Sequence, residues 1–108
     1  MLKGMRRLLR QCGYDTVPFE TANALRDHGD FDEAFCIVLD VNLSDGSGIE
    51  LRYQLVESGV ALPVIYITGN DSHATRMAAM ASGCLAYLTK PFTARSLIEP
   101  IERAAALA

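Results

Sequence analysis

Three polar residues of different chemistry stand at the ends of apolar runs in this sequence. Asp40, Thr68 and Lys90 lie at, or just beyond, the carboxyl ends of the runs 35–39, 63–67 and 84–88. A carboxylate can attack phosphorus and form an acyl phosphate. A hydroxyl can donate to phosphoryl oxygens, and an ammonium can hold them as a point charge. Together the three residue types indicate phosphoryl chemistry, provided that the fold brings them to one place.

Each of these residues also has an ordinary structural explanation. Asp40 could start a turn, Thr68 could simply end a strand, and Lys90 could be a solvated charge before a turn. Their occurrence at the ends of successive apolar runs is what favours a shared site.

Alternating patterns predict the elements that must position the three residues. The apolar runs have the composition of strands buried on both faces. Between them, apolar residues recur at helical spacing, and Gly or Pro separates the segments. Strands that alternate with helices of about ten residues are typical of a parallel sheet with right-handed crossovers. Since sites form outside the carboxyl ends of such strands, this fold would bring the three residues to one edge.

Other local signals predict an edge strand, helix caps and a helix defect. The segment 15–20 has the pattern of a short strand, and Pro18 cannot donate to a ladder, so we place the strand at a sheet edge. Thr21 is predicted to cap a short helix that closes at Gly29. Pro100 falls inside the last helical pattern and removes a helix hydrogen bond, so we expect a kink or a break there.

Composition fits one folded domain. The chain has 108 residues, half of them apolar, and a net charge of −3, which excludes a disordered tail. No apolar run is long enough to span a membrane. A duplex-binding domain usually has a basic surplus, which this chain lacks. The local basic cluster fits the solvated face of one helix and comprises Lys3, Arg6, Arg7 and Arg10.

The cysteines point to a reducing compartment. Cys12, Cys36 and Cys84 suit neither a zinc cluster nor a disulfide framework. Cys36 and Cys84 stand in apolar runs, so we expect both to be buried, reduced thiols of a cytoplasmic protein.

Three segments resemble the receiver domain of two-component response regulators, in a style similar to FixJ-type receivers. They are Val38-Leu-Asp-Val-Asn-Leu-Ser-Asp-Gly-Ser-Gly-Ile-Glu-Leu51, Leu62-Pro-Val-Ile-Tyr-Ile-Thr-Gly69 and Ala86-Tyr-Leu-Thr-Lys-Pro-Phe92. The resemblance implies a three-layer, flavodoxin-like or CheY-like α/β fold. The family's first strand and the acidic pair at its end have no counterpart here. We therefore expect residues 1–108 to form an N-terminally truncated receiver domain with about four parallel strands, helices on both faces and no output domain.

The resemblance also implies roles for individual residues. Asp40 would accept a phosphoryl group from a histidine kinase or a phosphotransfer protein. Thr68 and Lys90 would contact that group, with Thr68 moving when it arrives. Tyr87 would be the switch aromatic whose rotamer follows Thr68. The Lys90–Pro91 peptide would be cis, since an X–Pro bond has only a small trans preference.

The implied cofactor is Mg²⁺, held by the Asp40 carboxylate and the backbone carbonyl of Asn42. Phosphoryl transfer depends on a divalent ion to neutralise charge, and these two ligands alone make a poor site. We therefore expect the lack of the acidic pair to impair phosphorylation.

The missing central strand should have a structural consequence as well. A second molecule could fill the gap by edge pairing, which favours a homo-oligomer. The flanking strands could instead close up, or the N-terminal unit could dock elsewhere.

Three functions are open at this stage. The first is a signal receiver phosphorylated at Asp40. The second is a phosphorylation-independent interaction or dimerisation module that keeps the receiver fold. The third, a phosphatase-like enzyme, is disfavoured because such enzymes usually need an acid two residues after the nucleophile, and Asn42 cannot donate a proton as an acid would. We therefore expect a non-enzymatic protein that binds neither nucleic acid nor membrane directly.

Overall fold

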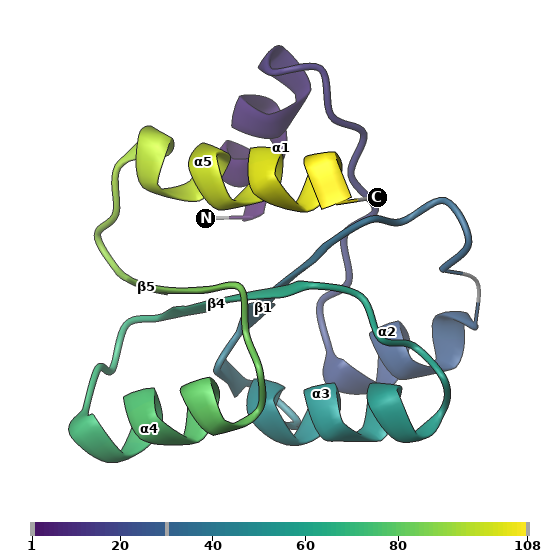
Figure 1. Cartoon of the computed structure of the whole chain (residues 1–108), viewed down its shortest axis with the longest axis vertical. Coiled ribbons are helices and arrows are strands. Elements are labelled where there is room, and N and C mark those ends of the chain that lie inside the picture. The colour runs from purple at the N-terminus through teal and green to yellow at the C-terminus, as the bar shows by residue number, and fades with distance from the viewer. Residues whose placement is uncertain (1, 30, 108) are drawn as a thin grey trace.

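Three parallel strands form the centre of the molecule. The computed structural model describes residues 2–29 and 31–107, and Figure 1 shows the sheet between two layers of helices. The sheet has the order β1-β4-β5, with the strands β1 (Ile37–Asp40), β4 (Val64–Thr68) and β5 (Ala86–Thr89). The parallel register pairs Asp40 with Ile67, and Thr68 with Thr89. The carboxyl ends of all three strands therefore lie at one edge.

Helices cover both faces of this sheet. One layer consists of α1 (Leu2–Gln11) and α5 (Ala94–Leu107), and the other consists of α2 (Ala22–His28), α3 (Gly48–Glu57) and α4 (His73–Ala81) (Figure 1). A small antiparallel hairpin follows β1 and is made of β2 (Asn42–Leu43) and β3 (Gly46–Ser47). The predicted three-layer α/β fold is confirmed. Among the described residues, no helix is both long and apolar enough to span a bilayer.

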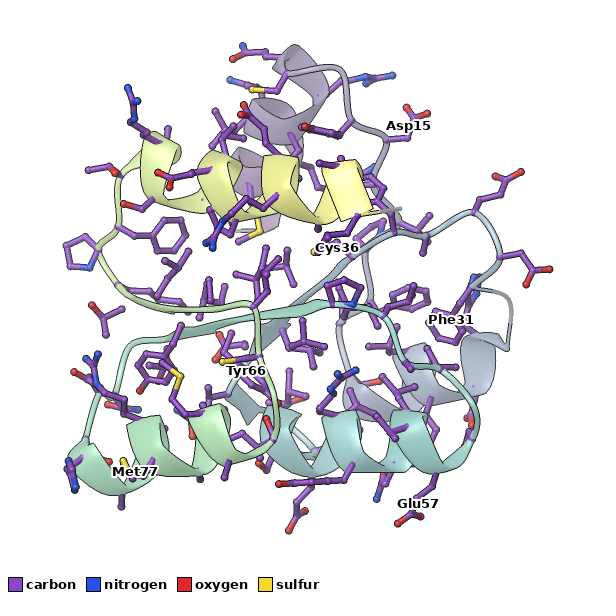
Figure 2. All side chains as sticks on the ribbon, in the orientation of Figure 1. Asp15, Phe31, Cys36, Glu57, Tyr66 and Met77 are labelled. Carbon is purple, nitrogen blue, oxygen red and sulfur yellow. The ribbon has the colours of Figure 1, made fainter. Side chains whose placement is uncertain are left out.

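Two apolar cores lie on opposite faces of the sheet. All five residues of β4 are buried. Val64 and Tyr66 join the core under α2, α3 and α4, whereas Ile65 joins Leu97 and other residues in the core under α1 and α5. Figure 2 shows Tyr66 on the α3–α4 side. Its buried hydroxyl is paired with the hydroxyl of Ser82 at 2.7 Å, so β4 buries a phenol at low polar cost.

The segment 15–20 is not a strand, contrary to the prediction. It runs as irregular backbone and is held by ring contacts. The ring centroids lie 4.9 Å apart for Phe19 and His28, and 5.7 Å apart for Tyr14 and Phe35. A strand needs a neighbour for its backbone groups, and no described strand lies between this segment and β1. The main sheet therefore has three strands rather than about four.

The predicted caps of the short helix are confirmed. The Thr21 hydroxyl accepts a hydrogen bond from the N–H of Ala24 at 3.0 Å. Gly29 closes α2 in the left-handed conformation, with φ of 75°, which glycine adopts without steric cost.

Of the kink or break predicted at Pro100, the break is wrong. Helix α5 continues through this residue to Leu107. Leu97 and Ile101 flank Pro100 and are both buried in the core. Their packing holds the helix together although one backbone hydrogen bond is lost.

The three cysteines are free thiols. Cys12 is exposed, and Cys36 and Cys84 are half-buried rather than fully buried. Burial raises the pKa of Cys36 to about 11, so this thiol stays protonated at neutral pH.

Candidate functional site

An ion pair joins the ends of the two outer strands. Lys90 Nζ lies 2.9 Å from Asp40 Oδ2. The side chains of Asp40 and Lys90 are 28% and 29% exposed, so the pair is partly open to solvent. The other carboxylate oxygen, Oδ1, accepts from the backbone N–H of Asn42 at 3.0 Å. The site thus offers an oriented carboxylate beside a fixed cation, which is suited to attack on phosphorus and to neutralising phosphoryl charge.

Thr68 supplies a buried hydroxyl at the end of the central strand. Its carbonyl accepts from the N–H of Lys90 at 2.8 Å. Its hydroxyl oxygen accepts from the N–H of Asn70 at 3.0 Å and from the Asn42 side-chain amide at 3.4 Å. Within the described part of the chain, no direct hydrogen bond joins Thr68 to Asp40. The structure therefore brings Asp40, Thr68 and Lys90 to one edge, with Asn42 between the carboxylate and the hydroxyl.

The backbone of Asp40 is packed tightly against Gly48. A Cβ atom at Gly48 would lie 2.2 Å from the carbonyl oxygen of Asp40. The N–H of Gly48 also donates to the carbonyl of Val41 at 2.9 Å. Only glycine lets the start of α3 approach the phosphoacceptor candidate this closely. This role of Gly48 was not predicted, because nothing in the local sequence pattern shows what faces the residue.

Asp45 ties the hairpin after β1 to helix α2. Its two carboxylate oxygens accept from the N–H groups of Ala22 at 2.8 Å and Asn23 at 3.1 Å. These backbone hydrogen bonds hold the pKa of Asp45 below its ordinary value. The contact spans more than twenty positions of sequence and was not predicted.

Tyr87 is held by residues of the β4–α4 loop and α4. Its hydroxyl donates to Asp71 Oδ1 at 2.9 Å, while Arg76 donates to Asp71 Oδ2 at 2.8 Å. The hydrogen bonds from Arg76 and Tyr87 lower the pKa of Asp71. Burial, and then the bond to Asp71, raise the pKa of Tyr87. The predicted switch residue Tyr87 is thus hydrogen-bonded to Asp71, a partner that was not predicted from the sequence.

The described residues fit Mg²⁺ poorly. Asp40 is a single carboxylate, and its oxygens already hold Lys90 and the N–H of Asn42. Residues 2–29 and 31–107 contain no group of three or more His, Cys, Asp or Glu side chains that could hold a metal ion. Proteins usually bind Mg²⁺ through one or two carboxylates together with waters and phosphates. The predicted pair of Asp40 and the Asn42 carbonyl falls short of such a site.

Comparison with protein families decides what kind of domain carries this site. The family model "Response regulator receiver domain" matches residues 1–102. The chain belongs to this family. The predicted receiver family is therefore confirmed, and the Lys90–Pro91 peptide is cis, as the resemblance implied.

Curated relatives of this receiver domain include response regulators from bacteria. "Response regulator protein TodT" of Pseudomonas putida strain F1 is 29% identical over 108 residues, which cover 100% of this chain and 48% of TodT. "Nodulation protein W" of Bradyrhizobium diazoefficiens is 30% identical over 101 residues, which cover 94% of this chain and 44% of the relative. The receiver domain thus spans about half the length of these relatives.

Solved structures agree with this assignment. The response regulator StyR matches with a TM-score of 0.87 and 32% identity, over 97% of this chain and 53% of StyR. The crystal structure of FixJ-N matches with a TM-score of 0.87 and 28% identity, over 98% of this chain and 85% of FixJ-N.

Proposed function

We propose that this receiver domain accepts a phosphoryl group on Asp40 from a histidine kinase or a phosphotransfer protein. In this step an Asp40 carboxylate oxygen attacks phosphorus, the P–N bond to the donor histidine breaks, and the histidine nitrogen takes up a proton. Lys90 stabilises the phosphoryl oxygens, and Thr68 donates its hydroxyl to one of them. The supporting observation is that Asp40 Oδ2 lies 2.9 Å from Lys90 Nζ, at the edge of the sheet where β4 ends in Thr68.

We also propose that phosphorylation is slow in this chain. Phosphoryl transfer relies on divalent ions to neutralise charge. Residues 2–29 and 31–107 hold no group of three or more His, Cys, Asp or Glu side chains that could bind a metal ion. We therefore expect metal ions to assist phosphorylation of Asp40 only weakly.

Labelling with acetyl phosphate and Mg²⁺ tests both proposals. Intact-mass spectrometry should detect the mass of one phosphoryl group on the wild-type chain, gained more slowly than on the TodT receiver measured in parallel. Asp40→Asn should abolish the gain, because an amide is not a nucleophile of this kind. Lys90→Ala should slow it by about 100-fold, the usual effect of removing one preorganised charge-stabilising group.

Two outcomes would contradict these proposals. Labelling that survives Asp40→Asn would exclude Asp40 as the phosphoacceptor. Labelling as fast as that of the TodT receiver would exclude the impairment.

A groove along β1 favours a second candidate function, an interaction module that pairs with a copy of itself. The N–H groups of Ile37 and Val41 donate towards the β4 side, so the backbone groups of Val38 and Asp40 face the open edge. A groove of about 850 Å³ runs along this edge and is lined by residues of α1, α2 and β1. We propose that a strand from a second copy covers this edge, since unpaired edges are templates for pairing.

Receiver domains are generally non-enzymatic signalling modules, and we propose the same for this chain. The amide of Asn42 stands two residues after Asp40, where a phosphatase of this type would carry an acid. The net charge of −3 argues against direct binding to nucleic acid. Free thiols support a cytoplasmic location.

A further inference from the structure

The groove along β1 lies between the two apolar cores of the molecule. One side is lined by Leu9 of α1 and Ile101 of α5, which belong to the core on one face of the sheet. The other side is lined by Leu25 of α2 and Leu51 of α3, which belong to the core on the opposite face. These helices form the two layers seen in Figure 1. A molecule that enters the groove therefore meets apolar side chains on both of its faces.

Backbone groups of β1 form a third side of the groove. The N–H groups of Ile37 and Val41 donate on the β4 side, each at 2.9 Å. Alternate residues of a strand turn their backbone groups to opposite sides, so the N–H and C=O of Val38 and the N–H of Asp40 face the groove. An acyl chain would bury these groups without partners, which is unfavourable. An extended peptide pairs with them as a neighbouring strand does, so the groove favours a strand over other apolar ligands.

The charged residues that line the groove are more acidic than basic. Asp15, Glu20 and Glu33 line it and are exposed. The Lys and Arg side chains that line it are those of Arg6, on α1, and of Lys90, which is already in an ion pair. This balance favours a partner with lysine or arginine beside its apolar residues.

The groove fits a single strand better than a strand within a folded layer. Residues 14–21 line the groove together with β1. The strands β1, β4 and β5 each lie between two layers of helices (Figure 1). A second copy would have to release a strand from its own sheet before that strand could enter. An extended segment that carries no helices on its faces enters without such unfolding.

We propose that the groove along β1 binds one extended segment of a partner chain as an additional strand. The segment has about four to six apolar residues, the usual length of a strand, with a basic residue beside them. This proposal deepens the second candidate function, because it rests on the same open edge and names the kind of segment that enters. It does not depend on whether Asp40 accepts a phosphoryl group.

Fluorescence anisotropy with the full chain and the labelled peptide Lys-Val-Ile-Val-Ile-Val-Lys tests this proposal. The peptide should bind to the wild-type chain. Proline in place of the central valine should weaken binding about tenfold to thirtyfold, as expected for the loss of one or two backbone hydrogen bonds. Glutamate in place of both lysines should also weaken binding, because carboxylates line the groove.

The decisive variant of the chain is Val38→Pro, which removes an N–H that faces the groove. Proline is tolerated in an edge strand where the missing N–H points away from the ladder, and circular dichroism checks that the variant is folded. Val38→Pro should weaken binding as much as proline in the peptide does. The matched control, Val38→Ala, keeps the N–H and should bind with nearly wild-type affinity.

Hydrogen exchange read by NMR provides a test on the wild-type chain. The peptide should slow exchange of the Val38 amide and leave that of Ile37 unchanged, since the Ile37 amide is already bonded within the chain. Peptide binding that leaves the Val38 amide unprotected would overturn the proposal, and so would equally tight binding of the proline-containing peptide.

Two further outcomes would overturn this proposal without excluding the functions proposed above. The first is a chain that light scattering shows to be a monomer and that does not bind the peptide. The second is an oligomer that the peptide neither binds nor dissociates, which would assign the groove to a second copy. Phosphorylation of Asp40 is measured separately by the labelling assay.

Discussion

At the scale of single residues, the position of the Asp40 backbone depends on the absence of a side chain at Gly48. The 2.2 Å approach between a Cβ at this position and the Asp40 carbonyl oxygen involves backbone on both sides. Backbone cannot rotate away as the end of a flexible side chain can. Any larger residue must therefore displace either the end of β1 or the start of α3.

Gly48→Ala should destabilise the fold by about 1–3 kcal/mol, the usual cost of overpacking a well-packed site. Urea unfolding followed by circular dichroism measures this change. Gly4→Ala is the matched control, since a Cβ there has no neighbour within 4 Å, and alanine favours a helix by up to about 1 kcal/mol. If the two variants unfold at the same urea concentration, the structure can accommodate a Cβ at position 48 without losing stability, which would contradict this prediction.

The convergence of Asp40, Thr68 and Lys90 was predictable because parallel strands place their carboxyl ends together. The contacts around these residues were not. Gly48 and Asp71 owe their roles to atoms from other elements, and a one-dimensional pattern carries no information about such neighbours. The roles of the three site residues in phosphoryl transfer stay predictions until labelling tests them.

At the scale of elements, α2 depends on a carboxylate from the hairpin after β1. This helix has only seven residues, and isolated helices of that length are unstable in water. Asp45 accepts hydrogen bonds from two N–H groups at its start, where a negative charge also favours the helix dipole. The hairpin and α2 should therefore gain and lose order together.

Stability should fall in acid partly because of Asp45. The pKa of Asp45 is lowered in the folded chain, so its contribution is complete above the unfolded pKa, near 3.8, and is lost as the pH falls through the lower folded value. Asp45→Asn should reduce the melting temperature at pH 7, and the difference from wild type should shrink below about pH 4.

Thermal unfolding of both chains across pH 2–7 measures this effect, with Glu57→Gln as the exposed-carboxylate control. A difference between Asp45→Asn and wild type that stays constant over this range would show that the charge of Asp45 does not stabilise α2.

Local sequence specified helix ends better than strands. Thr21 and Gly29 were predictable as caps because capping is decided within one turn of backbone. The segment 15–20 has a strand-like pattern but irregular structure, because a strand also requires a partner along its length. Pro100 stays inside α5 for a related reason, since packing of the whole helix outweighs one missing hydrogen bond.

At the scale of the whole molecule, the open edge of β1 makes association measurable residue by residue. If a second copy pairs with this edge, the amide of Val38 should exchange more slowly as protein concentration rises. The amide of Ile37 bonds to Pro63 within the chain at 2.9 Å and should be protected at every concentration.

Hydrogen exchange read by NMR, together with light scattering over the same concentrations, tests this expectation. A chain that scatters as a monomer throughout, with unchanged exchange at Val38, would rule out pairing through β1. A dimer in which Val38 stays unprotected would place the interface elsewhere.

The strand order also gives the three site groups unequal freedom to move. Thr68 belongs to β4, which is hydrogen-bonded to a strand on each side and is buried along its length. Asp40 is the last residue of the outer strand β1, and Lys90 directly follows the outer strand β5. Transient opening of a sheet begins at its margins and reaches the middle last. The backbone of Thr68 should thus be the least mobile of the three, and opening of either outer strand should change the backbone spacing of Asp40 and Lys90 around it.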